Sequence, residues 1–126
     1  MTARSRNASL VLQRQVLKTA DYTVVTTTDG GKIFSSFLDA IKYTLPAIAI
    51  GNTWTFLNLA KDGAAKLSVD PQTADGITWA GAQDTNKDLI NTKATQRKGD
   101  YVTLSSFTAT SFWQVPALRG LWAKET

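Results

Sequence analysis

The segment richest in groups that could carry out chemistry lies in the polar middle of the chain, at residues 84–88. Asp84 and Asp88 are spaced as in the first half of a calcium-binding loop. Positions six and twelve of such a loop should be Gly and Glu, and here they are Leu89 and Thr95. The segment also begins like the catalytic Asp-Thr-Gly triplet of aspartic proteases, but with Asn in the third place. We therefore interpret it as a turn in a polar loop, which leaves open only incidental Ca²⁺ binding at an Asp-rich turn.

Other catalytic groups are scarce throughout the sequence. The chain has no Cys and no His, which excludes thiol nucleophiles, thiolate metal sites and imidazole bases. Nine of the ten acidic residues are Asp, and most of them adjoin Gly or Pro, where Asp is favoured by turns. Gly30-Gly31-Lys32 lacks the spacing of a phosphate-binding loop. The sequence predicts no enzyme, no cofactor and no metal site.

Four Trp residues could stack on sugar rings or bases, or could be buried. Trp54 alternates with polar residues and shares a predicted strand face with Phe56, a pattern more typical of a core or a subunit interface. A glycan-binding platform is the alternative. The residues assigned to the core or to a trimer interface are Trp54, Phe56, Tyr101, Trp113 and Trp122.

The elements that must position these side chains are strands and turns. Thr occurs 18 times and Glu once, a composition that favours strands over helices. Residues 29–31 predict a hairpin turn that joins strands at 22–28 and 32–36. Further strands are expected at 41–45, 53–59, 67–69, 77–79, 89–90, 101–105, 112–115 and 119–123. Turn signals every 8–12 residues predict an all-β fold, an antiparallel β-sandwich resembling a jelly roll.

Charge divides the chain into two parts. Residues 1–18 contain four basic and no acidic side chains, whereas residues 19–126 contain ten of each. The sequence predicts a basic N-terminal arm over 1–18, extended or forming a short helix, and a β-sandwich domain over 19–126. Such an arm is either a solvated tail or a tether to an acidic surface. Its candidate contact residues are Arg4, Arg6, Leu10, Leu12, Arg14, Val16, Leu17 and Lys18.

Neither a secretory signal nor a membrane span is expected. The apolar stretch at 8–12 is shorter than the core of a signal peptide. The longest apolar run, at 43–50, contains Pro46 and falls far below the roughly 20 residues that a membrane span needs.

Three stretches, in this order and spacing, resemble β-domains on the virions of tailed bacteriophages: head decoration (cement) proteins, head fibres and parts of tail fibres. They are residues 21–34, from Asp-Tyr-Thr-Val to Asp-Gly-Gly-Lys-Ile-Phe; 44–56, from Thr-Leu-Pro-Ala to Trp-Thr-Phe; and 99–122, with Gly-Asp-Tyr-Val-Thr-Leu, Phe-Trp-Gln-Val and Gly-Leu-Trp. The chain departs from the family pattern at 34–44, which is more aliphatic, and at the long polar loop 84–98. The arm lies outside the resemblance.

The resemblance implies a homotrimer on a virus particle, without catalytic residues. We therefore expect a capsid decoration protein that binds the major capsid protein on the outer head surface and stabilises the capsid. The alternative is a tail-fibre or receptor-binding module that uses Trp residues and the loop at 84–98 on a glycan. A fibre usually needs a long shaft, for which 126 residues leave no room. We do not expect nucleic-acid binding, because only four charges cluster and the aromatic residues lie apart from them.

Overall fold

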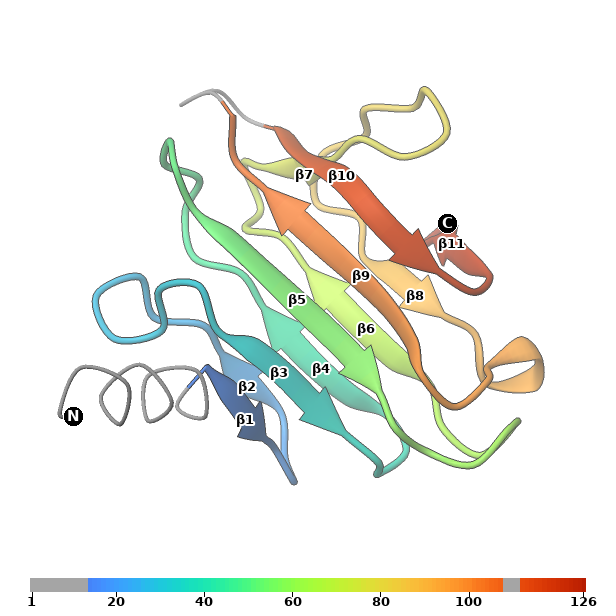
Figure 1. Cartoon of the computed structure of the whole chain (residues 1–126). Helices are drawn as coiled ribbons and strands as arrows, with labels where there is room; N and C mark the ends of the chain where they lie inside the picture. The colour runs from blue at the N-terminus through green and yellow to red at the C-terminus, as the bar shows by residue number, and fades with distance from the viewer. Residues whose placement is uncertain (1–13, 108–111) are drawn as a thin grey trace, which may run out of the picture.

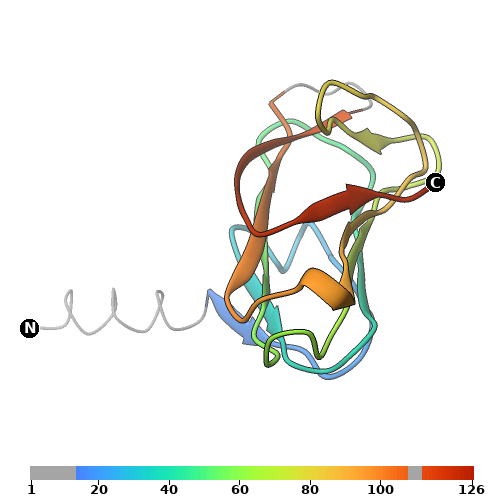
Figure 2. The same ribbon diagram turned by 90° about the vertical axis from the view of Figure 1, so that its right-hand side faces the viewer.

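Two β-sheets packed face to face make up the protein (Figures 1 and 2). The computed structural model describes residues 14–107 and 112–126. Within them one sheet has six strands in the order β1-β3-β5-β9-β10-β7, and the other has five in the order β11-β8-β6-β4-β2. The elements are β1 (Gln15–Leu17), β2 (Tyr22–Thr23), β3 (Ile33–Ser36), β4 (Ile41–Thr44), β5 (Thr53–Asn58), β6 (Leu67–Asp70), β7 (Gly76–Ile77), β8 (Leu89–Asn91), the 3-10 turn η1 (Lys93–Thr95), β9 (Asp100–Ser105), β10 (Phe112–Arg119) and β11 (Trp122–Lys124). The predicted all-β sandwich is confirmed.

The first six strands alternate between the two sheets. As a result β1, β3 and β5 pair in parallel in one sheet, and β2, β4 and β6 pair in parallel in the other. The chain thus winds as a flattened coil, which corrects the prediction of purely antiparallel pairing. The predicted turns are present between these strands, but each connects a strand of one sheet to a strand of the other instead of closing a hairpin.

The segment at 29–31 illustrates this correction. Gly31 has φ +68°, as expected of a tight turn, but the strands on either side, β2 and β3, belong to different sheets. The predicted hairpin between them is therefore wrong. Asp29 holds the connection together, because its carboxylate accepts hydrogen bonds from the Tyr22 hydroxyl at 2.6 Å and the Val25 amide at 2.8 Å.

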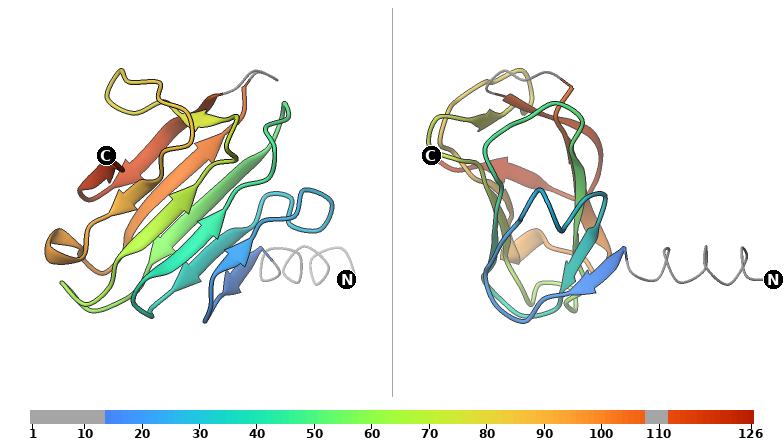
Figure 3. Two further views of the ribbon diagram at one scale, coloured as in Figure 1. Left: turned by 180° about the vertical axis from the view of Figure 1, so that it is seen from behind. Right: turned by 90° about the vertical axis from the view of Figure 1, so that its left-hand side faces the viewer.

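The later strands close the sandwich with antiparallel pairing. β9 runs antiparallel to β5 along six residue pairs, and β8 runs antiparallel to β6. β10 and β11 then continue the two sheets in the same antiparallel manner. Viewed from behind, the five-stranded sheet covers the other layer (Figure 3). The first six strands therefore pair in parallel within each sheet and the later strands pair antiparallel, except that β7 pairs in parallel with β10 at the edge of the six-stranded sheet.

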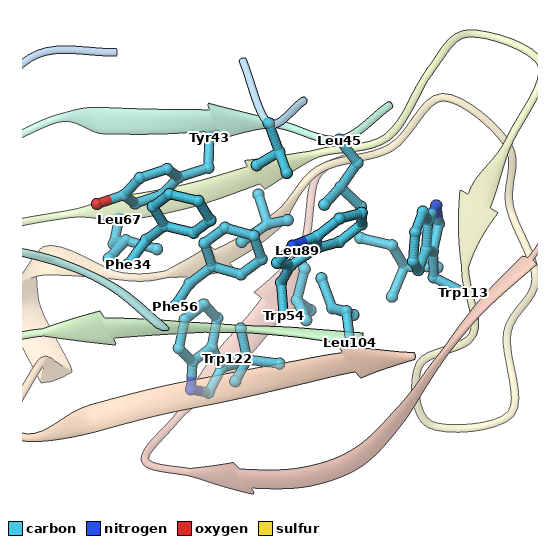
Figure 4. Close-up of a cluster of buried hydrophobic side chains, with 14 of the residues drawn as sticks. Phe34, Tyr43, Leu45, Trp54, Phe56, Leu67, Leu89, Leu104, Trp113 and Trp122 are labelled. Carbon is cyan, nitrogen blue, oxygen red and sulfur yellow. The ribbon is translucent and has the colours of Figure 1, made fainter. Parts of the chain in front are cut away.

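The core lies between the two sheets and is filled by the inward side chain of every second strand residue (Figure 4). Trp54, Phe56 and Trp113 are almost completely buried there. The rings of Phe34 and Phe56, which are paired across parallel strands, stack with their centroids 5.7 Å apart. Each fully buried large apolar side chain contributes roughly 1.5–3 kcal/mol to stability. The wide aromatic core therefore holds together a fold that has only short strands.

Candidate functional site: the basic end of the sandwich

Five cationic side chains extend from one end of the sandwich, from the loop after β5 and the loop after β8. These loops span residues 59–66 and 92–99. We call this group the basic end, and its members are Lys61, Lys66, Lys93, Arg97 and Lys98, all exposed. Lys93 pairs with Asp39 at 2.8 Å, and Arg97 pairs with Asp62 at 3.1 Å. At the surface, five positive and two negative groups leave an excess of three positive charges, and a third carboxylate, that of Asp100, is buried beneath them.

Gln96 binds the two loops to each other. Its buried side chain accepts hydrogen bonds from the amides of Ala64 and Ala65, at 3.0 and 3.3 Å. Its amide nitrogen donates to the Ala60 carbonyl at 2.9 Å. Because Gln96 belongs to one loop and these partners to the other, the two loops form one preorganised surface.

A buried polar network lies beneath this surface. Asn58 on β5 donates to Asn91 on β8 at 2.9 Å, and Asn91 donates to the Asp100 carboxylate on β9 at 3.1 Å. The same carboxylate accepts the Arg97 amide at 2.9 Å. All three side chains are buried and bonded to each other. Because they come from strands of both sheets, the network ties the two sheets together directly beneath the basic end.

Both acidic groups of the basic end carry their charge at neutral pH. The hydrogen bond from Lys93, together with the Lys66 amide, holds the pKa of Asp39 below its usual value. The Lys98 amide and the Arg97 guanidinium lower the pKa of Asp62 in the same way. These exposed ion pairs are screened by salt. The attraction of this end for an anionic partner should therefore weaken as the ionic strength rises.

The chemistry available here is electrostatic attraction and not covalent catalysis. Lys and Arg side chains attract carboxylates or phosphates. Residues 59–66 and 92–98 include no aromatic side chain, so this end offers no surface on which nucleic-acid bases could stack. The arrangement therefore fits an acidic protein surface better than a single-stranded nucleic acid.

The structure places four of the predicted core or interface residues in the core. Trp54, Phe56, Trp113 and Trp122 are buried there. Tyr101 instead lies half-buried on the outer side of the six-stranded sheet. Burial leaves no ring face of Trp54 available for a glycan.

The end of the predicted arm is part of the sheet. Arg4, Arg6, Leu10 and Leu12 lie outside the described residues. Arg14 is exposed, Val16 packs against the core, and Leu17 on β1 is 52% exposed. The Lys18 ammonium lies over the Tyr22 ring, 3.6 Å from its centroid. The boundary between arm and body therefore falls before β1, several residues earlier than the predicted break after residue 18.

The segment at 84–88 lies in the loop before β8, as interpreted from the sequence. No group of three or more potential metal ligands occurs among residues 14–107 and 112–126. Asp88 instead forms an ion pair with Lys42 at 3.3 Å. Burial, followed by the neighbouring Asp70 carboxyl, raises the pKa of Asp88 to about 6 against the opposing effect of Lys42.

The basic end was missed by sequence reasoning because its charges come from two loops that are distant in the sequence. Asp62 and Lys98, which are hydrogen-bonded, are 36 residues apart. The available signal was the density of cations at 93–98, close to a Gly that ends the loop. Charge density within one loop could not show that a second basic loop lies beside it.

Comparisons of the chain with protein-family models and with curated proteins found no match. In the part of the chain that the structure describes, no helix has the length and apolar character required to cross a membrane.

Proposed function

We propose that this protein is a structural virion protein: a capsid decoration (cement) protein that binds the major capsid protein on the outer head surface as a homotrimer and stabilises the capsid. The observation that carries the proposal is the preorganised basic end. A cationic surface fixed by buried amides can bind an acidic partner surface without first ordering its loops, which lowers the entropic cost of attachment. The sequence resemblance supplies the class of particle, and the proposal assigns no catalytic residue.

In this proposal the basic end contacts the capsid, and the residues before β1 supply a second contact. Charge complementarity steers the encounter and sets orientation. Apolar residues of the arm, such as Leu10 and Leu12, add buried area to the contact. A small rigid body attached at two places can brace neighbouring capsid subunits.

A tail-fibre or receptor-binding role is the alternative, and one observation favours it. Trp79 is the one half-buried Trp of the four, and all four lie in the described part of the chain. Beside it, the Thr78 hydroxyl accepts hydrogen bonds from Gln83 and Gln114 at 3.4 and 3.3 Å. A sugar offers an apolar face and hydroxyl groups, which an indole ring and neighbouring amide and hydroxyl groups can contact together. Trp79 also packs against the core, so much of its surface serves stability.

Co-sedimentation with undecorated heads tests the proposal. Lys61→Glu should weaken binding roughly tenfold or more, since it places like charges against each other. Lys87→Glu makes the same charge change at the opposite end of the sandwich, where Lys87 donates to the Thr126 carbonyl at 3.0 Å. It is the control: it should stay folded by circular dichroism and bind as the parent does. Failure of the parent to sediment with heads would contradict the proposal. Binding to host-cell glycans that is lost in Trp79→Ala would favour the receptor-binding alternative.

A further inference from the structure

The outer side of the six-stranded sheet is a second surface, and it carries almost no charged side chains. We call it the strand face: the outward side chains of β1, β3, β5, β9 and β10, centred on Ile33, Thr55 and Thr103, which are aligned across the sheet. Arg119, at the end of β10, is the one charged residue of these strands that is not buried, because Asp100 is turned inward. In Figure 1 this face looks toward the viewer, and no other described segment crosses it.

The polar groups at the centre of the strand face are already bonded to each other. The Thr55 and Thr103 hydroxyls are 2.8 Å apart, and the Thr53 and Ser105 hydroxyls are 2.9 Å apart. Burying a hydroxyl is costly mainly when it loses its hydrogen bond to water. Each pair keeps its one hydrogen bond when water is removed, so covering this face costs less than burying the same hydroxyls unbonded.

The outer side of the five-stranded sheet differs. Its strands present Lys42 and Asp70, and Asp88 lies beside them. Covering that side would remove charged groups from water, which is expensive unless a partner replaces their interactions. Of the two outer sides, the strand face is the one suited to a dry contact.

We propose that the strand face is the surface through which copies of this chain associate. When three copies turn this nearly uncharged face toward a common threefold axis, neighbouring faces meet without like-charge repulsion, whereas an acidic partner would find no cations there except Arg119. The face measures about 24 Å by 20 Å from strand spacing and rise. This is an area of about 480 Å² for each copy, roughly three-fifths of the 800 Å² that each partner contributes to a standard interface, so the contact belongs to the small class of interfaces and should dissociate on dilution.

This contact rests on the proposed function, because it is the subunit contact of the proposed trimer. The mass of the free protein in solution, measured by sedimentation, tests it. The parent should sediment as a multiple of 13.7 kDa, three times that mass for the trimer. Thr103→Lys should reduce the mass to 13.7 kDa while the protein stays folded by circular dichroism. Ile90→Lys, an equally half-buried strand position on the other outer side, is the control and should remain oligomeric.

A second measurement does not depend on disrupting the interface. Because the chain has no Cys, a single Cys introduced by Thr103→Cys can be tested for alkylation without interference. It should be protected in the oligomer and reactive after dilution, whereas Ile90→Cys should react under both conditions. Equal reactivity at the two positions in an oligomer would overturn the inference.

The outcomes separate this inference from the proposed function. A parent that is monomeric but binds undecorated heads overturns the strand-face contact alone. An oligomer that dissociates on Thr103→Lys but never binds heads overturns the decoration role alone. An oligomer that Thr103→Lys leaves intact and folded also contradicts the strand-face contact.

Discussion

The two ends of the sandwich are held together by different chemistry. At the basic end, the neutral amides of Asn58, Asn91 and Gln96 make most of the buried side-chain bonds, with Asp100 as an added acceptor. At the opposite end, formed by the loops before β3, β5 and β8, two buried carboxylates bind the loops, together with the Ser106 hydroxyl, which accepts the Asn52 amide at 3.0 Å. Asp29 accepts the Tyr22 hydroxyl, and Asp75 accepts the Ile48 amide at 2.9 Å.

This difference sets how each end responds to pH. Side-chain amides do not titrate, so their bonds at the basic end persist across the pH range in which the protein is folded. Burial disfavours the charge on Asp29, but bonds from Tyr22, Val25 and Lys32 outweigh it and lower its pKa. The stability that Asp29 contributes is therefore present above its unfolded pKa and lost as the pH falls through its folded pKa. The amide bonds beneath the basic end therefore persist in acid, whereas the bonds to Asp29 at the other end, and those to Asp39 and Asp62 at the surface of the basic end, weaken as these carboxylates are protonated.

The largest effect is expected from Gly120→Ala, at the basic end. Gly120 has φ +98°, and a Cβ there would collide with the buried Asp100 carboxylate. The change should cost about 2–5 kcal/mol in free energy of unfolding, measured by urea denaturation. The control is Gly51→Ala at the opposite end, where φ is +92° but nothing lies within 4 Å, so the cost should be about 1–2 kcal/mol. Equal costs would show that the two ends are equally tightly packed.

A somewhat smaller effect is expected from Gln96→Ala. It leaves the amide of Ala65 and the carbonyl of Ala60 buried without partners, at a cost of about 2–4 kcal/mol. Thr95→Ala, one residue earlier and exposed, should change stability by less than about 0.5 kcal/mol. Hydrogen exchange should show faster exchange in both loops of the basic end. Faster exchange in only one loop would contradict the idea that Gln96 joins them.

The smallest effect, and the one that sharpens the contrast in pH response, is expected from Asp88→Asn. With a folded pKa of about 6, above its unfolded value, Asp88 favours folding at low pH, and this contribution is lost as the pH rises from about 4 through 6. The variant should therefore be more stable than the parent at pH 7.5, by about 1–2 kcal/mol, and its stability should vary less between pH 4.5 and 7.5. Lys42, Asp70 and Glu125 surround this group. Because Lys42 opposes the rise in the pKa of Asp88, Lys42→Met should raise that pKa further. An unchanged pH profile would assign the titration to another group.

Individual strands could be predicted from the sequence, and their neighbours could not. The alternation in β5 was readable because side chains on a strand point to opposite sides with a period of two, and Trp54 and Phe56 are both buried as predicted. The residues at 29–31 correctly indicated a turn. Turn chemistry determines where the chain bends, whereas the choice of neighbour for β3 depends on the stacking of Phe34 on Phe56, a contact between residues far apart in sequence.

The candidate site was harder to predict for a related reason. Gln96 resembles any polar residue of a basic loop, and its role appears only when Ala60 and Ala64 are brought beside it by the fold. Asp88 was noticed for its spacing from Asp84, but its raised pKa comes from burial and from Asp70 on a neighbouring strand. In both cases the property belongs to the surroundings of the residue and not to the local sequence.

The coiled winding of the first six strands allows the protein to change length in whole units. Gln15 pairs with Ile33, and Ile33 pairs with Thr55, so successive coils advance by 18 and 22 residues. Duplication of one such segment between β2 and β3 would add one strand to each sheet, as repeats add to a solenoid. It would leave the antiparallel closing strands and the loops at 59–66 and 92–99 in place. Gene duplication could therefore lengthen the body of the protein while the surface proposed to attach it stays unchanged.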